Sequence, residues 1–314
     1  MSFAFVFAGQ GSQSLGMMGK LAALDTTVRD TFDEASRVLG YDLWKLTREG
    51  PEEALNATER TQPAMLAAGV ATWRLWQARG GGAPALVSGH SLGEFTALVC
   101  AGSLEFAATL ELVRFRGQVM QEAVPRGSGA MAAILGLSDE AVRTVCVQAA
   151  QGQVVEPVNF NSPAQVVIAG EAAAVQRAIE QAQSAGAKRA ITLPVSVPSH
   201  SSLMRGAGER LRERLSTLVV RRPLIRYLSA VDACSHESPQ DIREVLVRQL
   251  SSPVRWTETL RALSAADIAQ VIECSPGKVL TGLNRRIQPR EGLSFLALED
   301  PASLEAALTA TRGA

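Results

Sequence analysis

The chain has 314 residues, 46% of them hydrophobic, which is enough for a globular protein with one large core or two smaller ones. Its 31 lysines and arginines balance its 31 aspartates and glutamates, so no overall charge favours nucleic acid or an anionic membrane. The apolar run at the start is short, with no basic segment before it, which favours a buried strand over a signal peptide. No stretch of about 18 apolar residues predicts a membrane span, and the four cysteines are too scattered for a disulfide framework or a zinc site. We therefore expect a cytoplasmic globular protein.

In the N-terminal third, short apolar runs alternate with longer helical patterns, which is typical of an α/β architecture. Strands are expected at 2–8 and 85–88, and helices at 26–39, 63–79 and 92–101. The helix over 63–79 is expected to begin after Pro63, since proline is favoured at the start of a helix.

The middle of the chain has a different pattern. Strands are expected at 129–136, 154–160, 165–170 and 188–193, and helices at 138–150 and 171–186, the first of them capped by Ser138. This β-α-β-β-α-β order is that of a ferredoxin-like unit. We therefore expect a small ferredoxin-like subdomain at 128–196, inserted into a large α/β subdomain formed by 1–127 and 197–314.

The C-terminal part returns to the α/β pattern of the large subdomain. Helices are expected at 201–218, 239–250 and 256–265, and strands at 224–230 and 268–273.

The sequence Gly89-His90-Ser91-Leu92-Gly93 lies between an expected strand and an expected helix. A G-x-S-x-G sequence in this position is typical of a sharp turn that exposes a serine hydroxyl above a sheet. Gly89 and Gly93 leave room for the turn because they lack side chains, and the following helix offers unpaired N–H groups to a developing oxyanion. We predict that Ser91 is a nucleophile rather than a residue that only caps the helix.

A serine nucleophile needs a base, and the chain has three histidines to supply it: His90, His200 and His236. His90 directly precedes Ser91, so its side chain should point away from the serine, and His236 lies in a polar loop. His200 follows the inserted segment and is the favoured base. No acidic residue lies near His200 in the sequence, so its orienting partner is either a distant acid or a main-chain carbonyl.

Three motifs occur together and in this order: Gly9-Gln10-Gly11-Ser12-Gln13, Gly89-His90-Ser91-Leu92-Gly93-Glu94 and Val197-Pro198-Ser199-His200. Together they resemble the malonyl-CoA:acyl carrier protein transacylases of bacterial type II fatty acid synthesis. The likeness continues through 121–125, 157–163 and 247–250 as far as 276–282, and so covers nearly the whole chain. That family's fold is an α/β-hydrolase-like large subdomain with an inserted ferredoxin-like small one, which is the layout expected above.

The resemblance implies a role for each residue around the serine. Ser91 would carry the acyl group, and His200 would remove its proton and later protonate the leaving thiolate. The main-chain carbonyl of Gln249 would orient His200, which accounts for the missing acid. The N–H groups of Gln10 and Leu92 would form the oxyanion hole, and the glycines around Gln10 would let the main chain come close to the ester.

Arg116 matches the family's arginine that binds the free carboxylate of the malonyl group. A planar guanidinium can hold a carboxylate through two parallel hydrogen bonds, and a lysine cannot. The sequence pattern by itself favours a surface arginine beside Arg114 on a helix, so this role depends on the resemblance.

The implied activity is that of an acyl-carrier-protein S-malonyltransferase with a ping-pong mechanism. Malonyl-CoA would esterify Ser91, and the phosphopantetheine thiol of an acidic acyl carrier protein would then take the malonyl group. The mechanism needs no metal and no tightly held cofactor, and nothing in the sequence requires more than a monomer. Lys188-Arg189 and Arg285-Arg286 are candidate basic sites for the carrier protein.

Several other functions share parts of this pattern. A hydrolase would use the same serine turn but pass the acyl group to water. A free-standing malonyl acyltransferase serving a polyketide synthase, or the malonyl-transfer subunit of a malonate decarboxylase, would share the fold and the serine–histidine pair. A non-catalytic binding module would not need Ser91, His200, Gln10 and Arg116 together.

Overall fold

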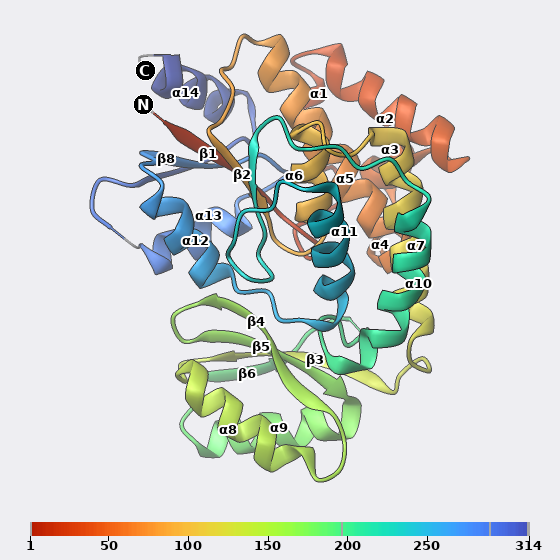
Figure 1. The fold of residues 1–314 in the computed structure, drawn as a ribbon, viewed down its shortest axis with the longest axis vertical. Coiled ribbons are helices and arrows are strands. Elements are labelled where there is room, and N and C mark those ends of the chain that lie inside the picture. The colour runs from red at the N-terminus through yellow and green to blue at the C-terminus, as the bar shows by residue number, and fades with distance from the viewer. Residues whose placement is uncertain (1, 196, 289, 313–314) are drawn as a thin grey trace.

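The computed structural model describes residues 2–195, 197–288 and 290–312, so Ser196, where the expected subdomain boundary falls, lies outside the described residues. The chain forms a larger α/β subdomain on a five-stranded sheet and a smaller one on a four-stranded sheet (Figure 1). This is the predicted α/β-hydrolase-like fold with a ferredoxin-like insertion.

The sheet of the large subdomain is parallel throughout, in the order β7-β2-β1-β8-β9. Its strands are β1 (Phe3–Phe7), β2 (Leu86–Gly89), β7 (Arg226–Leu228), β8 (Gln270–Glu273) and β9 (Ser294–Ala297). The central strand β1 is apolar and buried at every position, as expected for a parallel strand covered on both faces. In the register of β1 and β2, Phe7 pairs with Gly89, so the chain segments that follow these strands emerge side by side.

Helices pack around this sheet, and none of the helices in the described part of the chain is both long and apolar enough to span a membrane. They are α1 (Gly19–Ala22), α2 (Thr26–Leu39), α3 (Leu43–Glu49), α4 (Glu52–Asn56), α5 (Thr58–Ala78), α6 (Gly93–Cys100), α7 (Phe106–Glu122), α10 (Arg205–Ser216), α11 (Pro239–Arg248), α12 (Trp256–Ala265), α13 (Val279–Ile287) and α14 (Pro301–Arg312). Two 3₁₀ turns, η1 (Ser202–Met204) and η2 (Gln249–Ser251), adjoin α10 and α11.

The start of helix α5 differs from the one expected from the sequence. It begins at Thr58 and contains Pro63 in its interior, whereas the sequence pattern predicted a start after this proline. Proline removes one backbone donor and disfavours a helix interior. Here the helix is buried along most of its length, and burial of an apolar surface stabilises helices in proteins more than intrinsic propensity does.

The small subdomain has an antiparallel sheet in the order β4-β5-β3-β6, with two helices against one face. Its elements are β3 (Gly129–Leu135), α8 (Asp139–Ala150), β4 (Val155–Ser162), β5 (Gln165–Glu171), α9 (Ala172–Ser184) and β6 (Arg189–Thr192). The side chain of Ser138 accepts a hydrogen bond from the N–H of Ala141, so the predicted helix cap is confirmed. Figure 1 shows α8 and α9 on the side of this sheet that faces away from the large subdomain.

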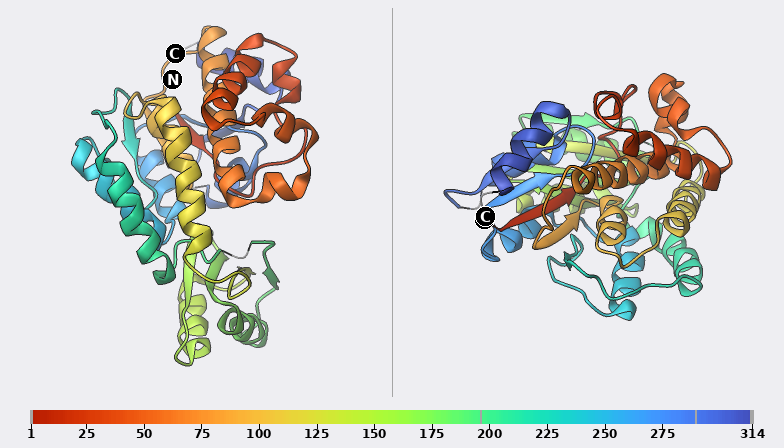
Figure 2. Two further views of the ribbon diagram at one scale, coloured as in Figure 1. Left: turned by 90° about the vertical axis from the view of Figure 1, so that its right-hand side faces the viewer. Right: turned by 90° about the horizontal axis from the view of Figure 1, so that it is seen from above.

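The two subdomains meet where β4 approaches the segment before α12. The N–H of Phe160 donates to the carbonyl of Val254 at 2.9 Å, and the N–H of Val254 donates to the carbonyl of Val158 at 2.8 Å. The long helix α7, yellow in Figure 2, runs from the large subdomain toward the small one. The region between the subdomains therefore receives residues from both.

Candidate active site

The serine lies at the turn from β2 into α6. Ser91 has φ 51°, a left-handed conformation that is uncommon for a residue with a side chain. A methyl group on Gly89 would lie 2.0 Å from the carbonyl carbon of Gly93, and one on Gly93 would lie 2.0 Å from the carbonyl oxygen of Phe7. As expected from the sequence, the turn can form only if both flanking positions are glycine.

His200 lies opposite the serine. Its Nε2 is 2.8 Å from Ser91 Oγ, and its Nδ1 is 2.8 Å from the main-chain oxygen of Gln249. A carbonyl oxygen only accepts hydrogen bonds, so Nδ1 carries the proton and the lone pair of Nε2 faces the serine hydroxyl. The partner of His200 is thus a main-chain carbonyl, one of the alternatives that the sequence left open.

Burial lowers the pKa of His200 to about 3, and the positive charge of Arg116 acts in the same direction. The hydrogen bond to Gln249 opposes this shift by favouring the charged form. The imidazole is therefore neutral near pH 7 and free to accept a proton.

Arg116 projects from α7 into the same site and is 1% exposed, so it is not a surface arginine. Its Nη1 donates to Gln62 Oε1 at 2.9 Å and its Nη2 to Gln249 Oε1 at 2.9 Å. The same Nη2 lies 3.3 Å from Ser91 Oγ. Burial lowers the pKa of Arg116 to about 10, opposed by the charge of Glu94, so the guanidinium stays protonated near neutral pH.

Two residues with main-chain N–H groups that are unpaired among the described residues also line the cavity around the serine. The loop after β1 lies directly against the serine turn, and a methyl group on Gly9 would be 2.5 Å from the carbonyl oxygen of His90. Gln10 and Leu92 both line the cavity that contains Ser91. In the described part of the chain, no group accepts a hydrogen bond from the N–H of Gln10 or of Leu92, so both donors are available to a developing oxyanion.

These groups share one cavity of about 340 Å³ between the subdomains. The large subdomain contributes Ser91, His200 and Arg116, and the small subdomain contributes apolar walls such as Met131 and the loop at Leu193. The cavity continues into an adjoining hollow of about 670 Å³, which shares Asn56 and Val197 with it.

Neither of the other two histidines pairs with the serine hydroxyl among the described residues, although His90 lines the same cavity. His90 Nε2 pairs with Asn161 Oδ1 at 2.9 Å, and its ring packs against Trp256 with centroids 5.6 Å apart. His90 therefore joins the serine turn to the small subdomain. His236 pairs with Asp232 at 3.1 Å and has no contact with the serine among the described residues.

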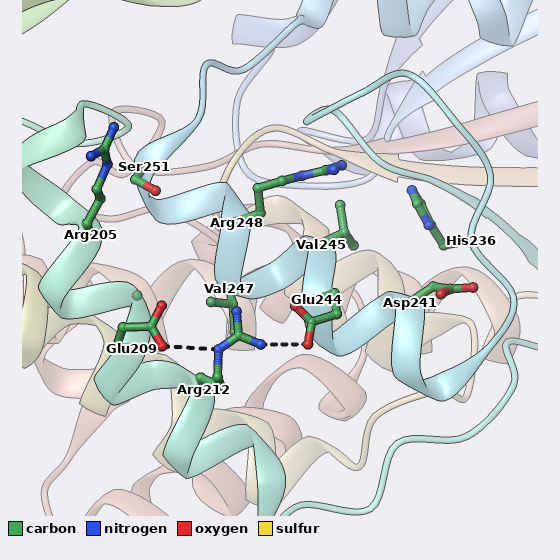
Figure 3. Close-up of a pocket in the computed structure, with 11 residues that line it drawn as sticks. Arg205, Glu209, Arg212, His236, Asp241, Glu244, Val245, Val247, Arg248 and Ser251 are labelled. Atoms are coloured by element: carbon green, nitrogen blue, oxygen red, sulfur yellow. Dashed lines mark hydrogen bonds and ion pairs between the residues drawn. The ribbon is translucent and has the colours of Figure 1, made fainter.

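Figure 3 shows a second cavity, of about 450 Å³, between α10 and α11. Arg212 crosses it and pairs with Glu209 on its own helix and with Glu244 on α11. Neither Ser91 nor His200 is among its described lining residues. This groove is separate from the serine site, and Arg212 at its centre is already paired with two carboxylates.

Two side chains at the site were not expected from the sequence. Gln62 on α5 binds Arg116, and Glu94 on α6 is completely buried and binds the side chain of Gln249. A lone acidic residue at the start of the apolar stretch Phe95–Cys100 is a signal that could have identified Glu94. In the part of the chain that the structure describes, no three His, Cys, Asp or Glu side chains gather to hold a metal ion.

A serine turn, a neutral histidine and two free N–H groups on this fold define the class of α/β enzymes that form an acyl ester on a serine. The family model of the acyl transferase domain matches residues 4–289. The malonyl CoA-acyl carrier protein transacylase of Salmonella typhimurium is 53% identical over 307 residues, which cover 98% of this chain and 99% of that protein. Its counterpart in Bacillus subtilis is 42% identical over 306 residues, covering 97% and 96%. The chain belongs to the malonyl CoA-acyl carrier protein transacylase family.

Solved structures agree with this assignment. An acyl carrier protein S-malonyltransferase from Vibrio cholerae superposes with a TM-score of 0.94 at 54% identity, covering 98% of this chain and all of that one. A malonyl-transacylase in complex with its type II PKS acyl-carrier protein gives a TM-score of 0.97 at 53% identity, covering 99% and 100%.

Proposed function

We propose that this protein transfers a malonyl group from malonyl-CoA to the phosphopantetheine thiol of acyl carrier protein, and so supplies fatty acid elongation. The observation that carries the proposal is the position of Arg116, whose Nη2 lies 3.3 Å from the Ser91 hydroxyl oxygen inside a buried pocket. An acyl group held on Ser91 meets a fixed positive charge directly beside it. A free carboxylate on that acyl group would satisfy the charge.

In the first half-reaction, Ser91 Oγ attacks the thioester carbonyl carbon while its proton passes to His200 Nε2. The N–H groups of Gln10 and Leu92 donate to the oxyanion of the tetrahedral intermediate. The carbon–sulfur bond then breaks, His200 gives its proton to the coenzyme A thiolate, and the malonyl ester of Ser91 remains.

The second half-reaction reverses these steps with another thiol. His200 takes the proton of the phosphopantetheine thiol, and the sulfur attacks the ester carbonyl. The bond from carbon to Ser91 Oγ breaks, and the proton returns from His200 to the serine. The main-chain carbonyl of Gln249 keeps the imidazole in the required tautomer throughout.

Arg116 would also make the basicity of His200 depend on which acyl group is bound. Burial is the larger cause of the low pKa of His200, and the charge of Arg116 lowers it further. A malonyl carboxylate bound to the guanidinium would offset that charge, so His200 becomes a stronger base when the correct acyl group is present.

We further propose subdomain boundaries near residues 128 and 196 and a cytoplasmic location. The boundaries are supported by a separate buried apolar cluster in the small subdomain, which extends from Ala132 to Ala182. The location is supported by the four cysteines, all of them free thiols.

A second candidate is a malonyltransferase that serves a polyketide synthase. It is favoured by the similarity to the transacylase whose complex with a type II PKS acyl-carrier protein has been solved. The chemistry at Ser91 would be the same, and only the carrier protein would differ. Transfer rates to purified fatty-acid and polyketide carrier proteins, measured side by side, separate the two candidates.

The proposed chemistry is tested by the intact mass of the protein after brief incubation with malonyl-CoA or acetyl-CoA. The wild type should gain one malonyl group, Ser91→Ala should gain none, and Arg116→Ala should lose malonyl loading or exchange it for acetyl. No adduct on the wild type, or one that survives Ser91→Ala, would show that the serine mechanism is wrong.

A further inference from the structure

Glu94 is a buried carboxylate that takes no part in the reaction steps described above. It lies in the first turn of α6, directly after the serine turn, and is 0% exposed. The hydroxyl of Tyr227 on β7 donates to its Oε2, and Gln249 Nε2 donates to its Oε1 at 3.0 Å. Burying a carboxylate costs free energy, so a fully buried one beside an active site requires a physical explanation.

The side chain of Gln249 connects Glu94 to the reacting groups. Besides Glu94, its Nε2 donates to the main-chain oxygen of Ser91 at 3.0 Å, and its Oε1 accepts from Arg116 Nη2 at 2.9 Å. The main-chain oxygen of the same residue holds His200. One glutamine therefore contacts the nucleophile, the base and the arginine.

Glu94 sets the direction of the Gln249 amide. A carboxylate and a carbonyl only accept hydrogen bonds, so the amide nitrogen must face Glu94 and Ser91. The amide oxygen must then face Arg116. If the amide turned over, its two N–H donors would meet the N–H donors of the guanidinium and that hydrogen bond would be lost.

The amide also keeps the two charges apart. Within the described residues, the hydrogen-bond partners of Arg116 are the amide oxygens of Gln62 and Gln249 and the hydroxyl of Ser91, all of them neutral. A carboxylate bound directly to Arg116 would occupy the donors that a substrate carboxylate needs. Because the Gln249 amide lies between them, Glu94 attracts the guanidinium charge without binding its N–H groups. The N–H groups of Arg116 can then be shared with the substrate carboxylate.

We propose that Glu94 is a positioning residue that, through the Gln249 side chain, orients Arg116 and offsets its buried charge, and so determines the preference for acyl groups with a free carboxylate. This inference rests on the proposed malonyl transfer. It assigns to Gln249 a side-chain function that is separate from the main-chain carbonyl at His200.

The test is Glu94→Gln, compared with the wild type in the rate of Ser91 loading by malonyl-CoA and by acetyl-CoA. A glutamine at position 94 removes the negative charge and replaces one of the two acceptor oxygens with a donor, so the charge of Arg116 is no longer offset and the direction of the Gln249 amide is no longer fixed by acceptors alone. The matched control is Glu273→Gln. Glu273 is also 0% exposed, but it binds the N–H groups of Leu280 and Thr281 and has no contact with Arg116 among the described residues.

Malonyl loading by Glu94→Gln should fall about tenfold while acetyl loading changes by less than about threefold, because the lost interaction serves only the carboxylate. The control should keep the wild-type ratio of the two rates. An equal fall in the malonyl and acetyl loading rates would mean that Glu94 is merely structural. Malonyl and acetyl loading rates that both stay at the wild-type values would also overturn the proposal.

Two further measurements keep the test decisive. Gln249→Leu keeps the main-chain carbonyl at His200 but removes the amide, so it should show the same loss of malonyl preference even if Glu94→Gln does not fold. The dissociation constant of free malonate, measured by calorimetry, should rise about tenfold in either variant. If the wild type is not loaded by malonyl-CoA at all, the proposed function fails, whereas an unchanged malonate affinity in the variants overturns the role of Glu94.

Discussion

Ser91 and His200, the two residues that would share the transferred proton, both have left-handed backbone conformations, with φ of 51° and 66°. Such conformations cost on the order of 1–3 kcal/mol each for residues with side chains, and they persist only where surrounding structure holds them. At Ser91 the support comes from β1 and β2, and at His200 it comes from the carbonyl of Gln249. These two conformations place Oγ and Nε2 2.8 Å from each other.

The pKa of His200 leads to a prediction about pH. Burial and the charge of Arg116 lower this pKa to about 3, so the imidazole remains neutral as the pH falls through the usual histidine range near 6.5. We expect kcat/KM for malonyl-CoA to show no loss from protonation of His200 between about pH 8 and pH 5. Stopped-flow or quenched acylation at constant ionic strength measures this profile, with folding checked by circular dichroism at each pH.

A rate that falls with an apparent pKa near 6.5 would contradict this prediction. The same shift has a consequence for stability, because the folded-state pKa lies below the unfolded one. The stabilisation associated with neutral His200 is complete above about pH 6.5 and is lost as the pH falls toward the folded-state pKa.

At the scale of helices and strands, the sequence predicts best those elements whose ends are marked by local chemistry. Helix α2 has the expected bounds because Asp25 caps its first turn and Gly40 ends it in a left-handed conformation. The start of helix α5 could not be predicted correctly from the sequence, because the packing that stabilises Pro63 inside the helix comes from distant parts of the chain. Helices α1, α3, α4, α13 and α14 and strand β9 were not among the expected elements, and α7 was expected only as a helix of unstated bounds around Arg114 and Arg116.

The site residues, too, could be predicted where local sequence marks them and not where distant contacts place them. Ser91 and its glycines form a local pattern, so the turn could be predicted from a few residues. Glu94 was missed as a site residue because its partners Tyr227 and Gln249 are 133 and 155 positions away in the chain. Arg116 could be placed on a helix from its surroundings, but only tertiary packing decides that its side chain is buried.

The serine turn gives a prediction at this scale. Gly93→Ala should destabilise the protein by about 2 kcal/mol or more, because its methyl group would lie 2.0 Å from the carbonyl oxygen of Phe7 and β1 and α6 would have to separate. Acyl transfer should fall with it, because the same separation displaces Ser91. Urea unfolding and the rate of malonyl loading measure the two effects.

The matched control is Gly282→Ala in α13, where a methyl group would meet no atom within 4 Å. It should be neutral or stabilise the protein by up to about 1 kcal/mol, since alanine favours helices over glycine. Equal stabilities of the two variants would show that the turn can accept a side chain.

At the scale of the whole molecule, the site depends on how the two subdomains meet. Met131, Asn159 and Leu193 of the small subdomain form one wall of the cavity that contains Ser91. The candidate carrier-binding pairs lie elsewhere, since Lys188-Arg189 and Arg285-Arg286 are absent from the described lining of this cavity. Arg286 instead donates to Gln165 Oε1 on β5 and so connects the subdomains. A role of these residues in carrier docking stays a prediction.

The hydrogen bond between Asn161 and His90 joins the small subdomain to the residue immediately before the nucleophile. We expect Asn161→Ala to cost about 1–2 kcal/mol of stability, because a nitrogen of a largely buried imidazole loses its partner. We also expect kcat/KM for malonyl transfer to fall several-fold, since the serine turn is then held from one side only. Steady-state kinetics and urea unfolding of the same samples separate the two effects.

Gln153→Ala is the matched control, since its amide binds Glu171 and Arg177 within the small subdomain and has no contact with the serine turn among the described residues. This variant should lose stability to a similar degree while keeping the wild-type kcat/KM. If Asn161→Ala behaves in the same way, the contact between the subdomains only stabilises the fold. If only Asn161→Ala loses activity, the small subdomain helps to orient the nucleophile as well as to form the pocket wall. Its docking against the large subdomain is then a condition for catalysis.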